Sequence, residues 1–220
     1  MSLEIVIGPM FSGKTSLLID KYNKLNNKLN NKLNVKTEDN SNSNYNYNYN
    51  CNRNCNRNSC LAINFSNKQT KKGFIISHDG DSIDCINCNN LNSLCNDIEN
   101  RIEFLKAEYI FINEAQFFQD LREWVLFNIK TFNKKIFLFG LDLDFKRKLF
   151  GQIHSLKPNS SMIINLKGKC SLCDLESEYS HRITSNHQQI LMDSSKYIPL
   201  CKKCWEKKNP EKIKFIDDIN

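Results

Sequence analysis

The stretch Gly8-Pro9-Met10-Phe11-Ser12-Gly13-Lys14-Thr15 decides the fold of this chain. It follows an apolar run at residues 3–7, which predicts a short buried strand, and it precedes residues 16–19, which can open a helix. A glycine, four residues and Gly-Lys-Thr form the Walker A pattern, in which backbone N–H groups and a helix N-terminus surround phosphate oxygens. We therefore expect this loop to bind nucleotide phosphates, with Lys14 reaching the outer phosphates and the Thr15 hydroxyl holding Mg²⁺. A chance glycine turn would lack the flanking strand and helix.

The chain has 220 residues, which allows one ordinary domain with an appendage or two small domains. Its formal net charge of +7 favours anionic ligands such as nucleotides, but a generally basic, solvated surface explains the charge equally well. No run approaches the roughly 18 apolar residues of a membrane span, and the immediate entry into a strand leaves no room for a signal peptide. We expect a cytoplasmic protein, in which closely paired cysteines are metal ligands and not disulfides.

Apolar runs and helical periodicities alternate along most of the chain. With a phosphate-binding loop near the start, this alternation predicts an α/β fold of the P-loop NTPase type, with a mostly parallel sheet and helices on both faces. Ligands then bind at the carboxyl ends of the strands, where the polar motifs fall. The expected strands are 3–7, 61–65, 73–76, 109–112 and 135–141, and the expected helices are 14–22, 92–105 and 117–132. The two later helices are expected to carry apolar faces made of Leu94, Ile98, Ile102 and Leu105, and of Leu121, Trp124, Val125 and Ile129.

Residues 23–59 are dominated by Asn, with Lys, Ser and Tyr. Such a tract has too few apolar groups to offset the entropy of ordering it. It predicts a disordered insertion that is dispensable for chemistry, because long surface loops add little closure entropy. The cysteines in or beside the tract match no common metal site and are expected to be free thiols: Cys51, Cys55 and Cys60.

Two weaker local patterns lie between this tract and residue 100. Cys85 and Cys88 form a Cys-x-x-Cys with Cys95 nearby, but no second pair lies at a suitable distance, so we expect no metal there. His78 beside Asp79 has the composition of a catalytic pair, although a histidine in such a turn is more often only solvated.

Two Cys-x-x-Cys pairs near the end of the chain, Cys170 with Cys173 and Cys201 with Cys204, are typical of a tetrahedral Zn²⁺ site. Their separation exceeds the roughly 15–20 residues usual in a zinc ribbon, so a long loop must project between them. Zinc ribbons often bind nucleic acid, but the acidic residues beside the first pair argue against such a partner. We expect a structural zinc clamp.

In this order the motifs resemble the zinc-containing cellular and viral thymidine kinases, the type II family. The loop at residues 8–15 is similar to that family's own form of the Walker A loop. Residues 113–118 resemble its Asp-Glu-x-Gln-Phe-Phe element, and residues 141–151 resemble its Leu-Asp-x-x-Phe-x-x-Lys-x-Phe-Gly loop. The two cysteine pairs, with Lys196-Tyr197 before the second, extend the resemblance to nearly everything except the Asn-rich tract.

The resemblance implies transfer of the γ-phosphate of ATP to the 5′-hydroxyl of thymidine. The loop would hold ATP and Mg²⁺, with Asn113 and Gln116 also at the ATP site. Glu114 would be the general base that accepts the proton of the 5′-hydroxyl, although a carboxylate at a strand end can also be a plain helix cap. The implied domains are a nucleotide-binding domain at 1–165, a zinc-binding lobe at 166–208 and a tail at 209–220.

The resemblance also implies how thymidine is held. Phe145 would lie against the thymine ring, and a lasso loop between the cysteine pairs would close over the base through backbone hydrogen bonds. Zinc would anchor this lasso and take no part in the chemistry, and the protein would be a homotetramer. The lasso residues nearest the base would be Gln188, Gln189, Ile190, Leu191 and Met192, with Tyr197 completing the wall.

Three departures from the family pattern keep alternatives open. Asn113 stands for the family's Asp, residues 68–71 replace an Asp-Thr-Arg-Tyr-like phosphate motif, and Met192-Asp193 replaces a Gly-Gly in the lasso. The first two bear on catalytic efficiency, and the third bears on substrate preference. One alternative is a catalytically impaired nucleotide-binding regulator, and another is an ATP-driven zinc-ribbon protein that binds nucleic acid.

Overall fold

The computed structural model describes residues 2–38, 59–67, 72–185 and 187–210. Their main element is a seven-stranded sheet of order β3-β4-β2-β5-β6-β1-β7. Neighbouring strands are parallel except β3 and β4, which pair antiparallel. The strands are β1 (Ser2–Ile7), β2 (Ser59–Phe65), β3 (Gly73–Ile76), β4 (Ser82–Cys88), β5 (Ala107–Asn113), β6 (Lys135–Gly140) and β7 (Met162–Asn165).

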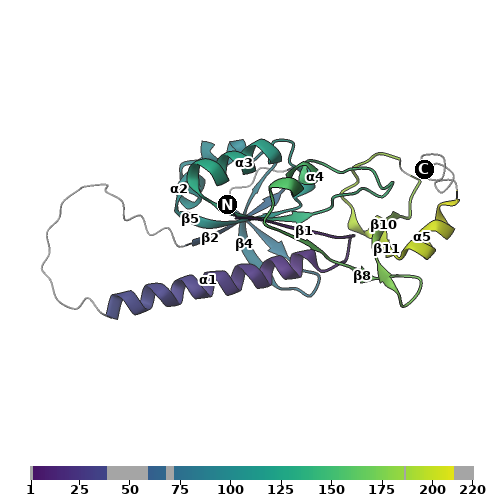
Figure 1. The fold of residues 1–220 in the computed structure, drawn as a ribbon, viewed down its shortest axis with the longest axis horizontal. Coiled ribbons are helices and arrows are strands. Elements are labelled where there is room, and N and C mark those ends of the chain that lie inside the picture. The colour runs from purple at the N-terminus through teal and green to yellow at the C-terminus, as the bar shows by residue number, and fades with distance from the viewer. Residues whose placement is uncertain (1, 39–58, 68–71, 186, 211–220) are drawn as a thin grey trace, which may run out of the picture.

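Helices cover both faces of this sheet (Figure 1). The long α1 (Lys14–Glu38) runs along one face, and α2 (Ile98–Lys106), α3 (Leu121–Phe132) and α4 (Ile153–Leu156) lie on the other. Because side chains alternate along a strand, Val6 and Phe111 pack in the core with α1, whereas Ile5 and Ile110 pack in the core with α2 and α3. The predicted α/β fold, mostly parallel with helices on both faces, is confirmed. Three short 3-10 helices complete this part: η1 (Asn92–Asn96), η2 (Ala115–Phe117) and η3 (Lys157–Asn159).

The first helix is longer than the sequence predicted. It was expected to end near residue 22, where the Asn-rich tract begins, but α1 continues to Glu38. The near-repeat inside the tract has a period of four residues, which places Leu25 and Leu29 on one side of the helix. Leu29 is buried and Leu25 packs against the core beneath the sheet. The prediction of a disordered insertion is therefore wrong for residues 23–38.

Other predictions fall where the structure is not described. Residues 39–58, with Cys51 and Cys55, lie outside the described residues, and so do 68–71 and 211–220. Cys60 is described, on β2, and is a free thiol as predicted. Burial raises the pKa of Cys60 to about 12, so this thiol is not reactive at neutral pH.

The segment predicted as one helix at 92–105 is divided in two. Asp97 separates η1 from α2, and its side chain accepts hydrogen bonds from two backbone N–H groups of α2. This start turns Phe104 toward the core, and of the predicted face only Leu94 is buried. The other three residues of that face are exposed, so their predicted burial is wrong: Ile98, Ile102 and Leu105. Helix α3 begins at Leu121 and not at 117, but it buries all four residues expected of it.

Strands β4 and β7 were not predicted. In β4 the pair Cys85 and Cys88 hid the alternation, because residues three apart on a strand point to opposite faces. The two thiols accordingly lie in different cores, on opposite faces of the sheet. Residues 77–80, which include His78 and Asp79, form the turn that joins β3 to β4, with Gly80 at φ 91°.

A small lobe follows β7 at the carboxyl end of the sheet strands (Figure 1). It contains two antiparallel pairs, β8 with β9 and β10 with β11, and its own core includes Tyr179, Leu200 and Trp205. The backbone N–H of Met10 donates to the Ser180 hydroxyl at 2.9 Å, which joins the glycine-rich loop to this lobe. Its elements are β8 (Gly168–Lys169), β9 (Glu176–Ser177), β10 (Tyr179–Arg182), η4 (Ser194–Lys196), β11 (Tyr197–Leu200) and α5 (Lys202–Lys208).

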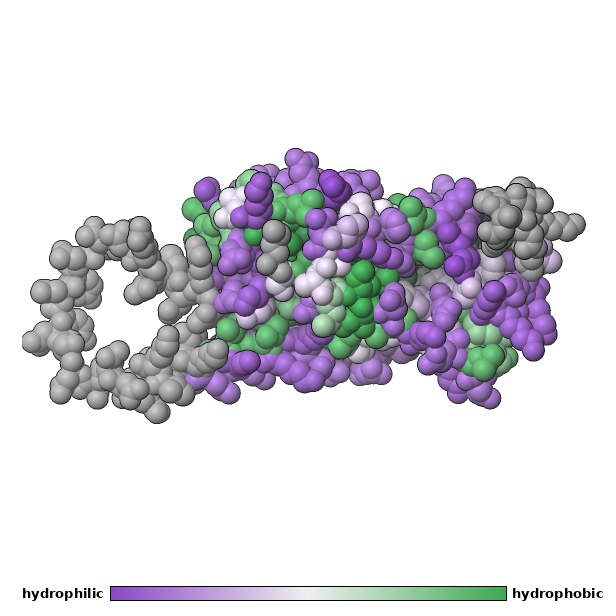
Figure 2. Space-filling view, in the orientation of Figure 1, coloured by the Kyte–Doolittle hydropathy of each residue, from purple (hydrophilic) through white to green (hydrophobic). Residues whose placement is uncertain are grey.

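The face of the molecule shown in Figure 2 is mainly hydrophilic, with several separate hydrophobic areas. The large apolar side chains exposed on α2 and α3 are Ile98, Ile102, Leu105, Phe127 and Phe132. Among the described helices none has the length and apolarity needed to cross a membrane.

Candidate functional site

A cavity of about 530 Å³ lies where the sheet, the glycine-rich loop (residues 8–15) and the C-terminal lobe meet. Small-molecule sites commonly have volumes of about 300–1,000 Å³. Three of the residues predicted for the site do not line this cavity: Gly8, Pro9 and Gln188. The structure brings the others together in its wall: Met10, Phe11, Ser12, Gly13, Lys14, Thr15, Asn113, Glu114, Gln116, Phe145, Gln189, Ile190, Leu191, Met192 and Tyr197.

The glycine-rich loop has the geometry of an anion cradle. Gly13 has a φ of 82°, a value that favours glycine, and a Cβ on Gly8 would overlap the carbonyl oxygen of Leu166. Ser12 Oγ is buried and has no hydrogen-bond partner among the described residues. An unpaired buried hydroxyl and a helix N-terminus suit a phosphate group, so the residues present fit a nucleotide phosphate.

The side chain of Lys14 folds back onto the same loop. Its Nζ donates to the carbonyl oxygens of Gly8 at 3.0 Å and Pro9 at 2.6 Å. Desolvation lowers the pKa of Lys14 from 10.5 to about 8, although Glu114 and Asp142 oppose this shift by charge attraction. An anion placed in the loop would favour the charged lysine and replace these carbonyl contacts.

Glu114 follows β5 directly and enters the cavity wall in a left-handed conformation, with φ at 52°. Such a backbone costs of order 1–3 kcal/mol for a residue other than glycine, and it is typical of functional sites. Gln116 is buried and donates through Nε2 to Glu114 Oε2 at 2.6 Å, while its Oε1 accepts the backbone N–H of Leu141 at 3.0 Å. The glutamine amide therefore fixes the orientation of the carboxylate.

Two glycines make room for this amide. A Cβ on Gly140 would overlap Gln116 Oε1, and a Cβ on Gly151 would overlap the backbone of Gln116. Gly151 also has a φ of 63°. The glycine that ends the loop at 141–151 is thus required by the position of Gln116, which the sequence assigned to the ATP site.

Oxygen-bearing side chains line the cavity next to the glycine-rich loop: the Thr15 hydroxyl, the Asn113 amide and the Glu114 carboxylate. Mg²⁺ prefers oxygen ligands and keeps several waters, so this donor set fits the ion. His78 also lines the cavity, with its ring centroid 6.2 Å from that of Phe11.

Phe145 is held by an arginine that the sequence did not single out. The guanidinium carbon of Arg182 lies 3.7 Å from the centroid of the Phe145 ring and 4.9 Å from that of Tyr197. Arg182 is 5% exposed and does not line the cavity, so it supports Phe145 from behind. No local motif could have identified Arg182, because its partners come from three separate segments.

Arg182 also holds the lasso, residues 183–196. Its two terminal nitrogens donate to the carbonyl oxygens of Gln188 and Gln189. Its Nε donates to the Tyr197 hydroxyl at 3.1 Å, and that hydroxyl donates in turn to the Leu191 carbonyl oxygen at 3.2 Å. A buried guanidinium with several paired donors is a rigid anchor, so the lasso backbone at residues 188–191 is fixed beside the cavity.

A second tie joins the lasso to the loop that carries Phe145. Asp144 is buried and accepts the backbone N–H groups of Lys146 at 2.8 Å and Lys148 at 2.9 Å, and also Gln189 Nε2 at 2.9 Å. Asp193, where the family has a glycine, accepts from the N–H of Ser195 and begins η4. The departure at 192–193 therefore provides a helix cap in place of flexible glycines.

The four predicted metal ligands meet in the lobe. The Sγ atoms of Cys170, Cys173, Cys201 and Cys204 all lie within 4.8 Å of one another. Cys173 Sγ is 3.6 Å from Cys201 Sγ and 3.7 Å from Cys204 Sγ. Tetrahedral zinc with Zn–S bonds of about 2.3 Å requires S···S separations of about 3.8 Å, so the cluster fits Zn²⁺.

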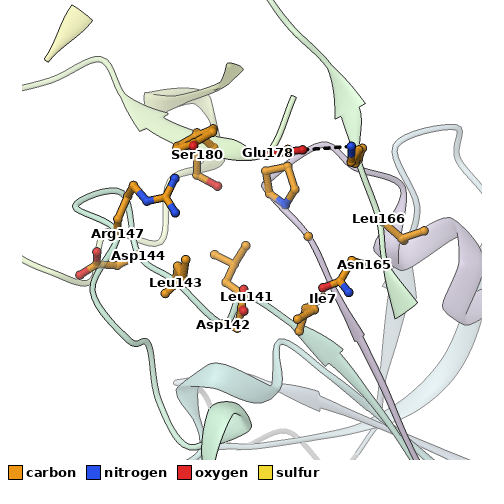
Figure 3. Close-up of a pocket in the computed structure, with 14 residues that line it drawn as sticks. Ile7, Leu141, Asp142, Leu143, Asp144, Arg147, Asn165, Leu166, Glu178 and Ser180 are labelled. Carbon is orange, nitrogen blue, oxygen red and sulfur yellow. Dashed lines mark ion pairs between the residues drawn. The ribbon is translucent and has the colours of Figure 1, made fainter. Parts of the chain in front are cut away.

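A second, smaller cavity of about 300 Å³ has Gly8 and Pro9 in its lining (Figure 3). The ends of β1, β6 and β7 form one wall, and Glu178 and Ser180 of the lobe form another. Two ion pairs involve residues of its wall, Lys167 with Glu178 at 3.0 Å and Asp142 with Lys157 at 2.9 Å, and the Arg147 guanidinium lies 4.2 Å from the centroid of the Tyr179 ring. Gly8 and Pro9 therefore line this second cavity and not the first.

The fold and the site together define an α/β protein in which one cavity is lined by a Walker A loop, a fixed carboxylate and a lobe that contains a cluster of four cysteines. A family model described as thymidine kinase matches residues 1–66 and 45–205. The chain therefore belongs to the thymidine kinase family.

Individual relatives agree over nearly the whole chain. A thymidine kinase of Amsacta moorei entomopoxvirus is 30% identical over 214 residues, which cover 93% of this chain and 98% of the relative. One from Yaba monkey tumor virus is 29% identical over 209 residues, covering 94% and 96%. The bovine protein named thymidine kinase, cytosolic, is 23% identical over 207 residues, covering 94% of this chain and 72% of the relative.

Proposed function

We propose that this protein is a thymidine kinase that transfers the γ-phosphate of ATP to the 5′-hydroxyl of thymidine and releases thymidine monophosphate. The observation that carries the proposal is one cavity with a phosphate cradle, a fixed carboxylate and an aromatic platform in its wall. Phosphoryl transfer needs positioning and charge neutralisation more than covalent chemistry, and this wall provides groups for both.

The donor half of the reaction belongs to the glycine-rich loop. Its N–H groups and Ser12 Oγ would hold the phosphates, and Lys14 would leave the carbonyl oxygens of Gly8 and Pro9 for the outer phosphate oxygens. Mg²⁺, when bound with ATP, would neutralise charge on the transferring phosphate, and Thr15 and Asn113 are the residues suited to hold it.

The acceptor half belongs to Glu114 and Phe145. Glu114 would accept the proton of the 5′-hydroxyl while the Gln116 amide holds its other oxygen. The thymine ring would stack against Phe145, whose ring Arg182 holds in place, beneath Leu191 and Tyr197. Backbone groups of the lasso would hydrogen-bond the edge of the base.

We assign a structural zinc ion to the four cysteines, because a site with four cysteine ligands has no open position for substrate. The same assignment divides the chain into a nucleotide-binding domain at 1–165, a lobe at 166–208 and a tail. Family resemblance supports a homotetramer, and the name of the bovine relative, a cytosolic thymidine kinase, supports a cytoplasmic protein.

Asn113 favours a second candidate, a nucleotide-binding regulator with weak or no turnover. An amide at this place cannot supply the negative charge that an aspartate gives to the metal site. The two candidates differ in one measurement, which is phosphate transfer to a nucleoside.

The test is a nucleoside panel with ATP and Mg²⁺. We expect thymidine to be phosphorylated with a kcat/KM at least about tenfold above that for cytidine or purine nucleosides, because the cavity offers one stacking platform and a fixed lasso backbone. Binding of ATP without transfer to any nucleoside would instead support the regulator.

Arg182 provides a prediction about substrate binding. Arg182→Met should raise the KM for thymidine by about tenfold, because Phe145 and the lasso lose their common support. The change in kcat should be smaller, because Glu114 is held by Gln116 and not by Arg182. Arg182→Lys should restore little, since an ammonium group cannot reproduce the planar fork. Steady-state kinetics measure both parameters, and Arg101→Met on the exposed surface of α2 is the matched control. An unchanged KM in a folded Arg182→Met protein would contradict the assigned support.

A further inference from the structure

Three asparagines form a ladder of amides across the sheet next to the glycine-rich loop. Asn113 Nδ2 donates to Asn64 Oδ1 at 3.0 Å, and Asn64 Nδ2 donates to Asn87 Oδ1 at 3.0 Å. The strand register places them side by side, because Asn64 pairs with Asn113 between β2 and β5 and with Asn87 between β2 and β4. All three lie near the carboxyl ends of parallel strands, where ligands of such sheets bind.

Only part of the ladder lies in the cavity wall. Asn64 and Asn113 line the cavity and Asn87 does not. Side chains two residues apart on a strand point to the same face of the sheet. The residues two or four positions before the ladder asparagines belong to the core on the side of α1: Cys60, Ala62, Cys85 and Phe111. The ladder therefore lies on the face of the sheet that carries the glycine-rich loop and α1. At the far end Gly73 leaves space for the amide, since a Cβ there would overlap Asn87 Nδ2.

The direction of the hydrogen bonds decides what Asn113 presents. Its Nδ2 is committed to Asn64, and no hydrogen bond within the described part of the chain uses its Oδ1. Asn113 is 8% exposed, so its amide has little freedom to turn. The acceptor end therefore remains for the cavity, where water on a bound metal ion is a donor.

An amide and a carboxylate differ in their need for such orientation. A carboxylate presents an acceptor oxygen whichever way it turns, whereas an amide turned over presents an N–H group that repels a cation. An asparagine at this place can assist a metal ion only if its neighbours hold the amide in the orientation that presents its oxygen to the ion.

We propose that Asn64 and Asn87 are positioning residues, which hold the Asn113 amide with its oxygen toward the Mg²⁺–ATP site. The proposal rests on the proposed function, in that Mg²⁺–ATP is the ligand. Neutral amides in series then take the place of a negative charge, and the departure at residue 113 is compatible with an active enzyme.

The test measures binding and does not depend on turnover. Calorimetry gives the affinity for ATP with saturating Mg²⁺ and with EDTA, and the ratio of the two affinities is the Mg²⁺ linkage. We expect Asn64→Leu to reduce this linkage by about tenfold, as expected for loss of one oriented charge-assisted hydrogen bond. Asn165→Leu is the matched control, because Asn165 also ends a parallel strand of this sheet but lies outside the ladder.

A second background separates positioning from mere structural support. In Asn113→Asp protein the orientation no longer matters, so adding Asn64→Leu should change the Mg²⁺ linkage less than about twofold. A purely structural role for Asn64 would give the same loss in both backgrounds and would overturn the proposal. Equal linkage in Asn64→Leu and Asn165→Leu proteins would overturn it as well.

The same preparations distinguish this proposal from the proposed function. Transfer of phosphate to thymidine together with an unchanged linkage in Asn64→Leu protein would reject the ladder and keep the kinase. The expected linkage pattern without any transfer would keep the ladder and favour the regulator. A wild-type protein that binds ATP without any effect of Mg²⁺, or does not bind ATP, would reject the ladder outright.

Discussion

Glu114→Gln should lower kcat for thymidine phosphorylation by about 10²–10⁴-fold, the range typical of a lost general base. The substitution keeps the shape of the side chain but removes its capacity to accept the proton of the 5′-hydroxyl. Because the loop that holds ATP is unchanged, the affinity for ATP should change little. Rapid-quench measurement of the transfer step, together with calorimetry of ATP binding, checks both statements.

Glu108→Gln is the matched control for this experiment. Glu108 lies at the opposite end of the same strand, β5, and forms an ion pair with Lys135 at 2.7 Å. Partly exposed ion pairs of this kind contribute about 0–1 kcal/mol, so the control should retain wild-type turnover. Glu114→Gln protein with wild-type kcat would show that Glu114 is only a structural residue at the strand end.

Removal of zinc should abolish thymidine binding and leave most of the ATP binding. A zinc ion held by the four cysteines would fix the lobe that carries β10, β11 and the lasso, and a structural zinc ion typically contributes about 10–16 kcal/mol to such a unit. Trp205 is buried in this lobe with its ring centroid 5.3 Å from that of Tyr179, so its fluorescence should report the loss of packing. Chelation followed by calorimetry with each ligand is the measurement.

Cys201→Ser should reproduce the effect of the chelator without added reagent. Cys95→Ser is the matched control, since Cys95 is an exposed free thiol outside the cluster. We expect one zinc ion per chain in wild-type and control proteins, by elemental analysis. A zinc-free protein that still phosphorylates thymidine would exclude the structural role of the cluster.

The sequence predicted the parts of the site that depend on local motifs. The glycine-rich loop, Glu114 and the cysteine pairs are each recognisable within a few residues. The structure places the loop and Glu114 at the carboxyl ends of parallel strands and brings the four cysteines together in the lobe. Arg182 and the ladder could not be predicted, because their contacts join strands and loops far apart in the chain. A single sequence carries no signal for such pairings.

The errors in the fold have a common physical origin. The composition of residues 23–38 suggested disorder, but Leu25 and Leu29, at a spacing of four, continue the apolar side of α1 beyond residue 22. The apolar face of α2 was misplaced because Asp97 restarts the helix and turns Phe104 inward. In both segments tertiary packing determined the extent of the helix or its buried side, which average composition and a simple periodicity did not predict.

The most direct test of the proposed function follows the transferred phosphate itself. Purified protein is incubated with thymidine, Mg²⁺ and ATP labelled at either the γ or the α phosphorus, and the nucleotides are separated. The proposal predicts label in thymidine 5′-monophosphate only from γ-labelled ATP, and loss of that product in Lys14→Ala protein. Label released as inorganic phosphate without any thymidine monophosphate, or no consumption of ATP at all, would contradict the assignment of this chain as a thymidine kinase.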